Sequence, residues 1–151
     1  MRTIIQRVEQ AEVKIDGKST GKINQGLLVL IGFEEEENQE DFDWIIKKII
    51  QLRIFNDENQ VMNKSVQDVG GEILVVSQFT LHANSKKGNR PSYIRAAHPE
   101  IAIPYYEKFI SEIEVFFGKK VQTGEFGADM KITLLNDGPV TIILDSKTKD
   151  F

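Results

Sequence analysis

Apolar and polar side chains alternate in the first part of the chain, and this pattern predicts a β-hairpin. Residues 11–15 place apolar side chains at every second position, and Asp16-Gly17 is typical of a tight turn into a second strand at residues 18–23. The apolar positions of residues 4–8 have the opposite parity. Such a change of face predicts either a bulge or a strand that passes between two sheets.

The pattern then changes twice. Residues 27–33 are apolar almost throughout, which predicts a strand buried on both faces. Over residues 42–53 the apolar spacing becomes helical, and Asn38 is placed to cap that helix. A further strand is predicted at residues 73–81, after a pair of glycines that interrupts the chain.

The last third of the chain predicts a helix followed by two strands. The helix is expected at residues 101–117, with Pro104 in its first turn, where a missing N–H costs no hydrogen bond. Strands are expected at residues 131–135 and 139–144, and residues 146–151 are expected to be a frayed tail. We therefore predict an α+β fold for the whole chain, which would be a single compact domain. Largely antiparallel sheets would form a barrel-like core with two main helices.

Charge is distributed unevenly along the chain. The net charge is −4, and residues 34–43 hold seven acids and no base. Because Asp and Glu stabilise the first turn of a helix, we interpret this run as the solvated entrance of the first helix rather than as a metal site. Between Ile73 and Pro99 there is no acid, and the basic residues there are Lys86, Lys87, Arg90 and Arg95. Such a stretch can attract phosphates, and it can equally be an ordinary solvated loop.

Composition excludes several classes of protein. The chain has no cysteine, which excludes disulfide frameworks, thiolate zinc sites and cysteine nucleophiles. No apolar run approaches the roughly 20 residues that span a bilayer. The first residues lack the apolar core of a signal peptide. We expect a cytosolic protein with no membrane partner.

Candidate catalytic side chains are few. On a strand, Thr80 and His82 would share a face and form a nucleophile and base pair, but no acid lies nearby in the sequence to orient the imidazole. We therefore interpret His82 as a hydrogen-bonding or exposed residue, and His98 as a cap or surface residue. No cluster has metal-ligand spacing and no glycine motif cradles a phosphate, so no metal or cofactor is expected. Composition and spacing alone leave the function open.

Two short segments are similar to the signatures of the D-aminoacyl-tRNA deacylases. Ser77–Leu81 reads SQFTL, and Asn136–Thr141 reads NDGPVT, which resembles the family pattern N-x-G-P-V-T. Three more matches follow in the family's order, at residues 2–8 (RTIIQRV), 86–93 (KKGNRPSY) and 124–130 (GEFGADM). Five matches in register are far more specific than any single one. The chain departs from the usual residues at His82 and Asn84, which puts detail of the basic loop in doubt.

The resemblance implies an editing hydrolase that cleaves the ester between a D-amino acid and the terminal ribose of tRNA. It implies a homodimer whose active sites lie at the interface, with a cis Gly138-Pro139 peptide that reaches into the partner's pocket. Arg7 would hold this peptide from behind. A local interpretation of the same residues, as a turn between strands, also applies.

The resemblance also assigns roles within the pocket. Ser77, Gln78 and Phe79 would bind the substrate, while Phe126 and Met130 would bracket the adenine, although core packing explains Met130 equally well. The catalytic set would be Gln78, Phe79 and Thr80. Lys86, Lys87 and Arg90 would contact the tRNA backbone.

The implied chemistry needs no side-chain base. Backbone N–H groups around Phe79 and Thr80 would polarise the ester carbonyl, and the neighbouring ribose hydroxyl would help to activate water. Thr80 would be a hydrogen-bonding residue of the pocket and only secondarily a candidate nucleophile. A rigid Gly138-Pro139 wall would reject L-residues by a clash at Cβ, and we therefore expect glycyl-tRNA to be hydrolysed as well. Two alternatives stay open: an editing domain of the same fold for another misacylated residue, and a non-catalytic nucleic-acid-binding module.

Overall fold

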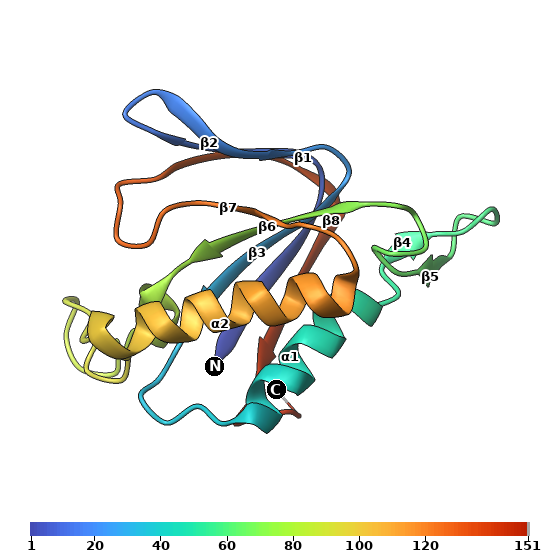
Figure 1. Ribbon diagram of the computed structural model, residues 1–151. Coiled ribbons are helices and arrows are strands. Elements are labelled where there is room, and N and C mark those ends of the chain that lie inside the picture. Colours follow the sequence, from blue (N-terminus) through green and yellow to red (C-terminus); the bar gives the residue numbers. More distant parts are fainter. Residues whose placement is uncertain (151) are drawn as a thin grey trace.

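The computed structural model describes residues 1–150, and Phe151 lies outside the described residues. Figure 1 shows a strongly twisted sheet with two helices along one side. The strands are β1 (Arg2–Ile15), β2 (Lys18–Ile23), β3 (Gly26–Gly32), β4 (Phe55–Asn56), β5 (Met62–Lys64), β6 (Glu72–Ser77), β7 (Gln122–Thr123) and β8 (Lys131–Asp145). The helices are α1 (Gln39–Gln51), the 3-10 helix η1 (Phe79–His82) and α2 (Pro99–Phe117).

The long strand β1 organises the sheet. One edge of β1 pairs with β8, and the other edge pairs with β3 in its first half and with β2 in its second half, all antiparallel. Beyond β3 the sheet continues through β6 and β7 in parallel pairings. The sheet nearly closes, because a Cβ at Gly21 in β2 would lie 2.5 Å from the Thr123 carbonyl oxygen in β7. The predicted α+β class with a barrel-like core is thus confirmed, and the two parallel pairings make the sheet mixed.

Two hydrophobic cores lie on opposite faces of the shared strands. Alternate residues of β3 and β6 point to each side, as the two-residue period of a strand requires. Leu27, Val29, Ile31, Ile73 and Val75 join the core beneath the helices, whereas Val8, Ala11, Val13, Ile23, Leu28, Leu74 and Val76 fill the barrel. The prediction that residues 27–33 are buried on both faces is confirmed.

The predicted change of face in the first strand is also confirmed. The register between β1 and β8 shifts between Gln6 and Val8 and again between Val8 and Gln10. As a result Ile5 packs into the helix core, whereas Val8 packs into the barrel core. The predicted strands 131–135 and 139–144 form the two halves of β8, on either side of this irregularity.

Both helices have clear local signals. Asn38 caps α1: its side chain accepts from the Asp41 N–H, and the Asp41 carboxylate accepts from the Asn38 N–H at 2.9 Å. Helix α2 begins at Pro99, two residues before the predicted start, because proline fits the first helical position. Pro104 therefore lies in the second turn, and its placement in the first turn was wrong.

The strand predicted at residues 73–81 ends early. Strand β6 stops at Ser77, and Phe79–His82 form η1 instead. The N–H of Gln78 still donates to the Ile31 carbonyl at 2.7 Å, after which the chain leaves the sheet. Thr80 and His82 are therefore not on one face of a strand, as had been expected.

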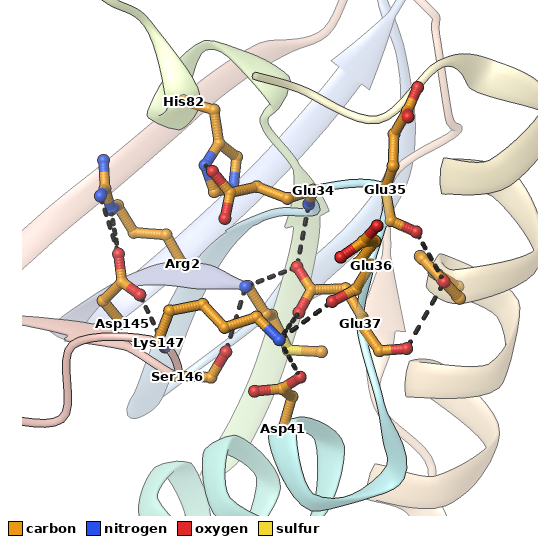
Figure 2. Close-up of polar contacts among 12 residues, drawn as sticks. Arg2, Glu34, Glu35, Glu36, Glu37, Asp41, His82, Asp145, Ser146 and Lys147 are labelled. Carbon is orange, nitrogen blue, oxygen red and sulfur yellow. Dashed lines mark hydrogen bonds and ion pairs between the residues drawn. The ribbon is translucent and has the colours of Figure 1, made fainter.

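The acidic run is only partly solvated, which corrects its interpretation as a solvated helix entrance (Figure 2). The Glu37 side chain is fully buried and lies 2.5 Å from the Met1 ammonium group and 3.6 Å from the Lys147 ammonium group. Asp41 is also buried and pairs with Lys147 at 2.5 Å. Two of the acids thus belong to an ion-pair cluster composed of Met1, Glu37, Asp41 and Lys147, in which the Lys147 side chain is partly exposed.

The segment expected to fray is held in place as far as Lys149. Ser146 is buried, and its N–H donates to the Met1 carbonyl at 2.9 Å. Lys149 pairs with Glu40 at 3.0 Å. No helix within residues 1–150 is long and apolar enough to cross a membrane.

Candidate functional site

A pocket of about 310 Å³ opens where β6 ends. Residues 76–79 line one side, and residues 126–130 with Ile132 line the other. The structure therefore brings together five of the predicted site residues that are far apart in the sequence: Ser77, Gln78, Phe79, Phe126 and Met130. Sequence reasoning missed the contribution of Ala128 and Asp129 to the same wall.

The turn that follows β6 leaves two of its own backbone donors unused. The N–H groups of Phe79 and Thr80 begin η1, so the turn's own hydrogen bonds do not use them. The Leu81 carbonyl accepts from the Arg2 guanidinium at 2.8 Å, which fixes the far end of the turn. The Thr80 hydroxyl accepts from the Gln78 side-chain amide and does not line the pocket.

An aromatic contact joins this turn to the basic loop. The Phe79 ring is 54% exposed and meets the Tyr93 ring edge-on, with centroids 5.1 Å apart. Paired backbone hydrogen bonds between Asn84 and Ser92, at 2.8 and 2.9 Å, close the loop just before Tyr93. Tyr93 was not singled out from the sequence, although it ends the segment that reads KKGNRPSY.

The basic loop presents cations to solvent. Lys86, Lys87 and Arg90 are exposed, and within residues 1–150 none of them forms an ion pair. Arg95 differs, because its guanidinium lies 2.9 Å from the Glu34 carboxylate. Three of the four cations are thus available to a negatively charged partner.

The opposite wall is supported from behind. The Phe126 ring lies 5.9 Å from the Tyr106 ring, and the Tyr106 hydroxyl donates to the Val75 carbonyl at 2.9 Å. Burial raises the pKa of Tyr106, so this hydroxyl stays protonated. The Met130 sulfur lies against Gly124 so closely that a Cβ there would collide with it. Gly124 therefore gives Met130 its position.

His82 corrects an expectation. The side chain was predicted to be hydrogen-bonded or exposed. It is buried instead, and neither ring nitrogen has a hydrogen-bond partner among residues 1–150. Its Nδ1 lies 3.5 Å from the Glu34 carboxylate. Burial lowers the pKa of His82, and the negative charge of Glu34 opposes this shift. His98 occupies the cap position of α2 with an exposed side chain that makes no cap hydrogen bond, as predicted for a surface residue.

The turn between the halves of β8 lies outside this pocket. The peptide between Gly138 and Pro139 is cis, and both residues are exposed. From behind, Arg7 donates to the carbonyls of Asp137 and Ile54 at 3.2 and 2.6 Å. A Cβ at Gly138 would lie 2.6 Å from the Arg7 guanidinium, and φ at Gly138 is +121°, so the position requires glycine.

The pocket contains no arrangement for binding a metal. Within residues 1–150, no group of three or more His, Asp or Glu side chains is placed to hold a metal ion. Asp129, on the pocket wall, pairs with Lys131 at 2.7 Å. The pocket is lined by Ser77, Gln78 and Phe79 on one side and by a wall that includes Phe126 and Met130 on the other.

Comparison with known proteins identifies close relatives. The family model described as D-Tyr-tRNA(Tyr) deacylase matches residues 4–145. Proteins named D-aminoacyl-tRNA deacylase from Flavobacterium johnsoniae and Parabacteroides distasonis are 65% and 63% identical over 150 residues, which is 99% of this chain and all of each relative.

Two solved structures share the fold. A structure described as "c-Myc DNA Unwinding Element Binding Protein" is 38% identical, with a TM-score of 0.91 over 96% of this chain and 98% of that one. A second, described as "a probable eukaryotic D-amino acid tRNA deacylase", is 17% identical, with a TM-score of 0.82 over 95% of this chain and 98% of that one. The second likeness supports the fold alone.

Proposed function

Since the chain belongs to the D-Tyr-tRNA(Tyr) deacylase family, we propose that it hydrolyses the ester of D-aminoacyl-tRNA to tRNA and free D-amino acid and rejects L-aminoacyl-tRNA. The family membership confirms the resemblance of the two signature segments and makes the chain a hydrolase of aminoacyl-tRNA esters. Its place of action would be the cytoplasm, where tRNA is charged and used.

One observation carries the proposal most directly. The pocket joins Gln78 and Phe79, at the turn after β6, to a wall that contains Phe126 and Met130. An aromatic ring and a thioether on one wall suit the flat face of a terminal adenine. The ester carbonyl, one ribose away from that adenine, would then lie near the N–H groups of Phe79 and Thr80.

The reaction follows from that placement. The two N–H groups stabilise the negative charge that develops on the carbonyl oxygen when water adds to the carbon. The free hydroxyl of the terminal ribose relays a proton: it takes one from that water while it gives its own to the neighbouring ester oxygen of the ribose. The bond between that oxygen and the carbonyl carbon breaks, which restores the ribose hydroxyl and releases the D-amino acid as a carboxylic acid. The Thr80 hydroxyl accepts a hydrogen bond from the Gln78 side-chain amide, so Thr80 positions Gln78 and does not attack the ester.

A second copy of the chain would complete the site. Gly138 and Pro139 do not line the pocket of their own chain, and Arg7 directs their turn outward from behind. Strand β8 pairs only with β1 among the described strands and exposes Leu135 and Ile143 at 49% and 41%. A free strand edge with apolar side chains favours pairing with another copy. The homodimer would place the turn of one subunit over the pocket of the other.

Selection against L-residues would work by exclusion. The rigid Gly138-Pro139 turn would occupy the space that the Cβ of an L-residue needs, while a D-residue points elsewhere. Glycine has no Cβ, so the wall cannot reject it. Glycyl-tRNA is therefore an expected substrate.

The test uses D-tyrosyl-, L-tyrosyl- and glycyl-tRNA under identical conditions. We expect hydrolysis of the D-tyrosyl and glycyl esters and little hydrolysis of the L-tyrosyl ester. Comparable cleavage of the L-ester would instead identify an editing domain of the same fold with another substrate. Cleavage of D-tyrosyl-tRNA with glycyl-tRNA left intact would mean that selection needs a positive contact with the D side chain, and the exclusion mechanism would be wrong.

A second candidate function is nucleic-acid binding without catalysis. The name of the 38% identical relative mentions a DNA element, and the exposed Lys86, Lys87 and Arg90 suit a phosphate backbone. This alternative predicts salt-sensitive binding with no ester hydrolysis at any enzyme concentration.

A further inference from the structure

A second hollow, of about 450 Å³, lies along the C-terminal half of α1, away from the pocket after β6. Its lining consists of Trp44, Lys47, Lys48, Gln51, Leu52 and Arg53. Three of these six side chains carry positive charge and none carries negative charge. The sequence indicated a basic surface only in the loop that contains Lys86, Lys87 and Arg90, and it marked α1 only by the acidic residues at its start.

The cations of this hollow are not neutralised by the protein. Lys47, Lys48 and Arg53 are exposed, and within residues 1–150 none of them forms an ion pair with a carboxylate. Arg53 is held by a hydrogen bond from its Nε to the Asn63 carbonyl at 2.9 Å. Charged groups that the protein leaves unpaired on one concave surface favour an anionic partner.

An aromatic ring lies among these charges. The Trp44 ring has two ammonium groups near its face, that of Lys48 at 5.9 Å and that of Lys149 at 5.6 Å from the ring centre. Lys149 also pairs with Glu40, which holds it beside the ring. Lysines beside an indole combine positive charge, which binds nucleic-acid phosphates, with a flat aromatic surface, on which bases can stack.

The hollow lies next to the turn that we assign to the partner's pocket. The Arg7 guanidinium bonds to the carbonyl of Ile54, the residue after Arg53, and to the carbonyl of Asp137, the residue before Gly138. One side chain therefore connects the end of the hollow to the start of the turn. If the turn covers the pocket of a second subunit, the hollow therefore also lies near that pocket.

We propose that this hollow binds backbone phosphates of the tRNA whose aminoacyl end occupies the partner subunit's pocket. This inference rests on the proposed function and adds a phosphate-binding surface in trans. Each tRNA would then touch both subunits: one hydrolyses the ester, and the other supplies the Gly138-Pro139 turn and the Lys47 and Lys48 ammonium groups.

The test measures the affinity for uncharged tRNA as a function of salt in the variant Lys47→Ala/Lys48→Ala. Alanine favours a helix, so α1 should persist. Each phosphate contact contributes roughly 0.7 to 0.9 to the slope of log affinity against log salt. Loss of two contacts should therefore reduce the slope by about 1.5 and weaken binding on the order of tenfold near physiological salt.

The matched control is Lys18→Ala/Lys22→Ala, which removes two exposed charges of β2 that form no ion pair within residues 1–150. Equal affinities and slopes for the variant and this control would overturn the proposal, even if the variant lost affinity for a DNA duplex. Lys47→Gln/Lys48→Gln serves if the alanine variant fails to fold.

Hydrolysis of D-tyrosyl-adenosine, which lacks the tRNA body, separates the two proposals. We expect the Lys47→Ala/Lys48→Ala variant to cleave this small ester at the rate of the unmodified protein. If the unmodified protein cleaves neither this ester nor D-tyrosyl-tRNA, the proposed function fails. The binding measurement on uncharged tRNA still decides whether the hollow holds phosphates.

Discussion

Replacing Asp41 by Asn should make the protein less stable at neutral pH and change how its stability depends on acid. The Asp41 carboxylate is only 6% exposed and pairs with Lys147 at 2.5 Å. Burial by itself raises the pKa of Asp41, but hydrogen bonds from Lys147, Asn38 and Ser146 outweigh it and lower the pKa from 3.8 to about 2. The folded protein therefore binds a proton at this carboxylate more weakly than the unfolded chain does.

The sign and size of the effect follow from that difference. A carboxyl group with a lowered pKa contributes stability that is fully present above its unfolded pKa of 3.8 and is lost as the pH falls toward about 2. A shift of this size corresponds to about 2 kcal/mol. Lys147 keeps Glu37 as a partner at 3.6 Å, so removing the Asp41 charge does not leave Lys147 unpaired.

Urea unfolding measures the free energy of unfolding of both proteins from about pH 7 to about pH 2. Trp44, the single tryptophan, reports the unfolding of α1 by fluorescence. The control is Glu40→Gln, which removes the same charge from the same turn, because Glu40 is 80% exposed and should matter little.

The expected result is a stability gap between Asp41→Asn and the unmodified protein that is present at neutral pH and closes near pH 2. If the two curves fall in parallel between about pH 5 and about pH 2, Asp41 does not protonate in that window and the assigned pKa is wrong. A loss of the same size in Glu40→Gln would mean that helix-end charge, rather than the buried pair, sets the stability.

His82→Leu should leave the hydrolysis rate unchanged and change the free energy of unfolding by no more than about 1 kcal/mol, because it removes two ring nitrogens that have no hydrogen-bond partner. A loss of about 10⁴-fold in the rate would instead make His82 a catalytic residue. Tyr93→Leu should lower kcat/KM for D-tyrosyl-tRNA roughly threefold to tenfold by freeing the Phe79 ring, whereas Tyr93→Phe should not; equal losses in both would contradict a ring contact. Gly124→Ala should displace Met130 and raise KM for D-tyrosyl-adenosine, and an unchanged KM would remove Met130 from the binding wall.

Local periodicity predicted the strands well where burial and sequence agree. The burial of residues 27–33 and the change of face after Val8 could be predicted because successive side chains of a strand point to opposite faces of the sheet. The end of β6 could not, because Phe79 and Leu81 continue the alternation while the backbone already turns into η1. The parallel pairings of β3 with β6 and β6 with β7 also leave no local signal, since they depend on long connections.

The sequence predicted which segments contain the site residues, but not how these segments come together in space. The two motif segments contain Gln78, Phe79, Phe126 and Met130, but only the tertiary fold places them around one pocket. The burial of Asp41 was missed for a similar reason, because its partner Lys147 lies more than a hundred residues away in the sequence. Charge counts within a segment cannot reveal such a pair.

The pocket wall that contains Phe126 and Met130 rests on both cores, one on either side of β3 and β6. Val76 and Met130 belong to the barrel side, whereas Phe126 packs on the helix side. A substitution such as Leu28→Ala in the barrel would shift the Met130 side chain, and one such as Phe109→Ala beneath the helices would shift the Phe126 ring. Changes in either core can therefore move one of these two side chains without the other, so substrate preference can diverge among relatives whose pocket residues are identical.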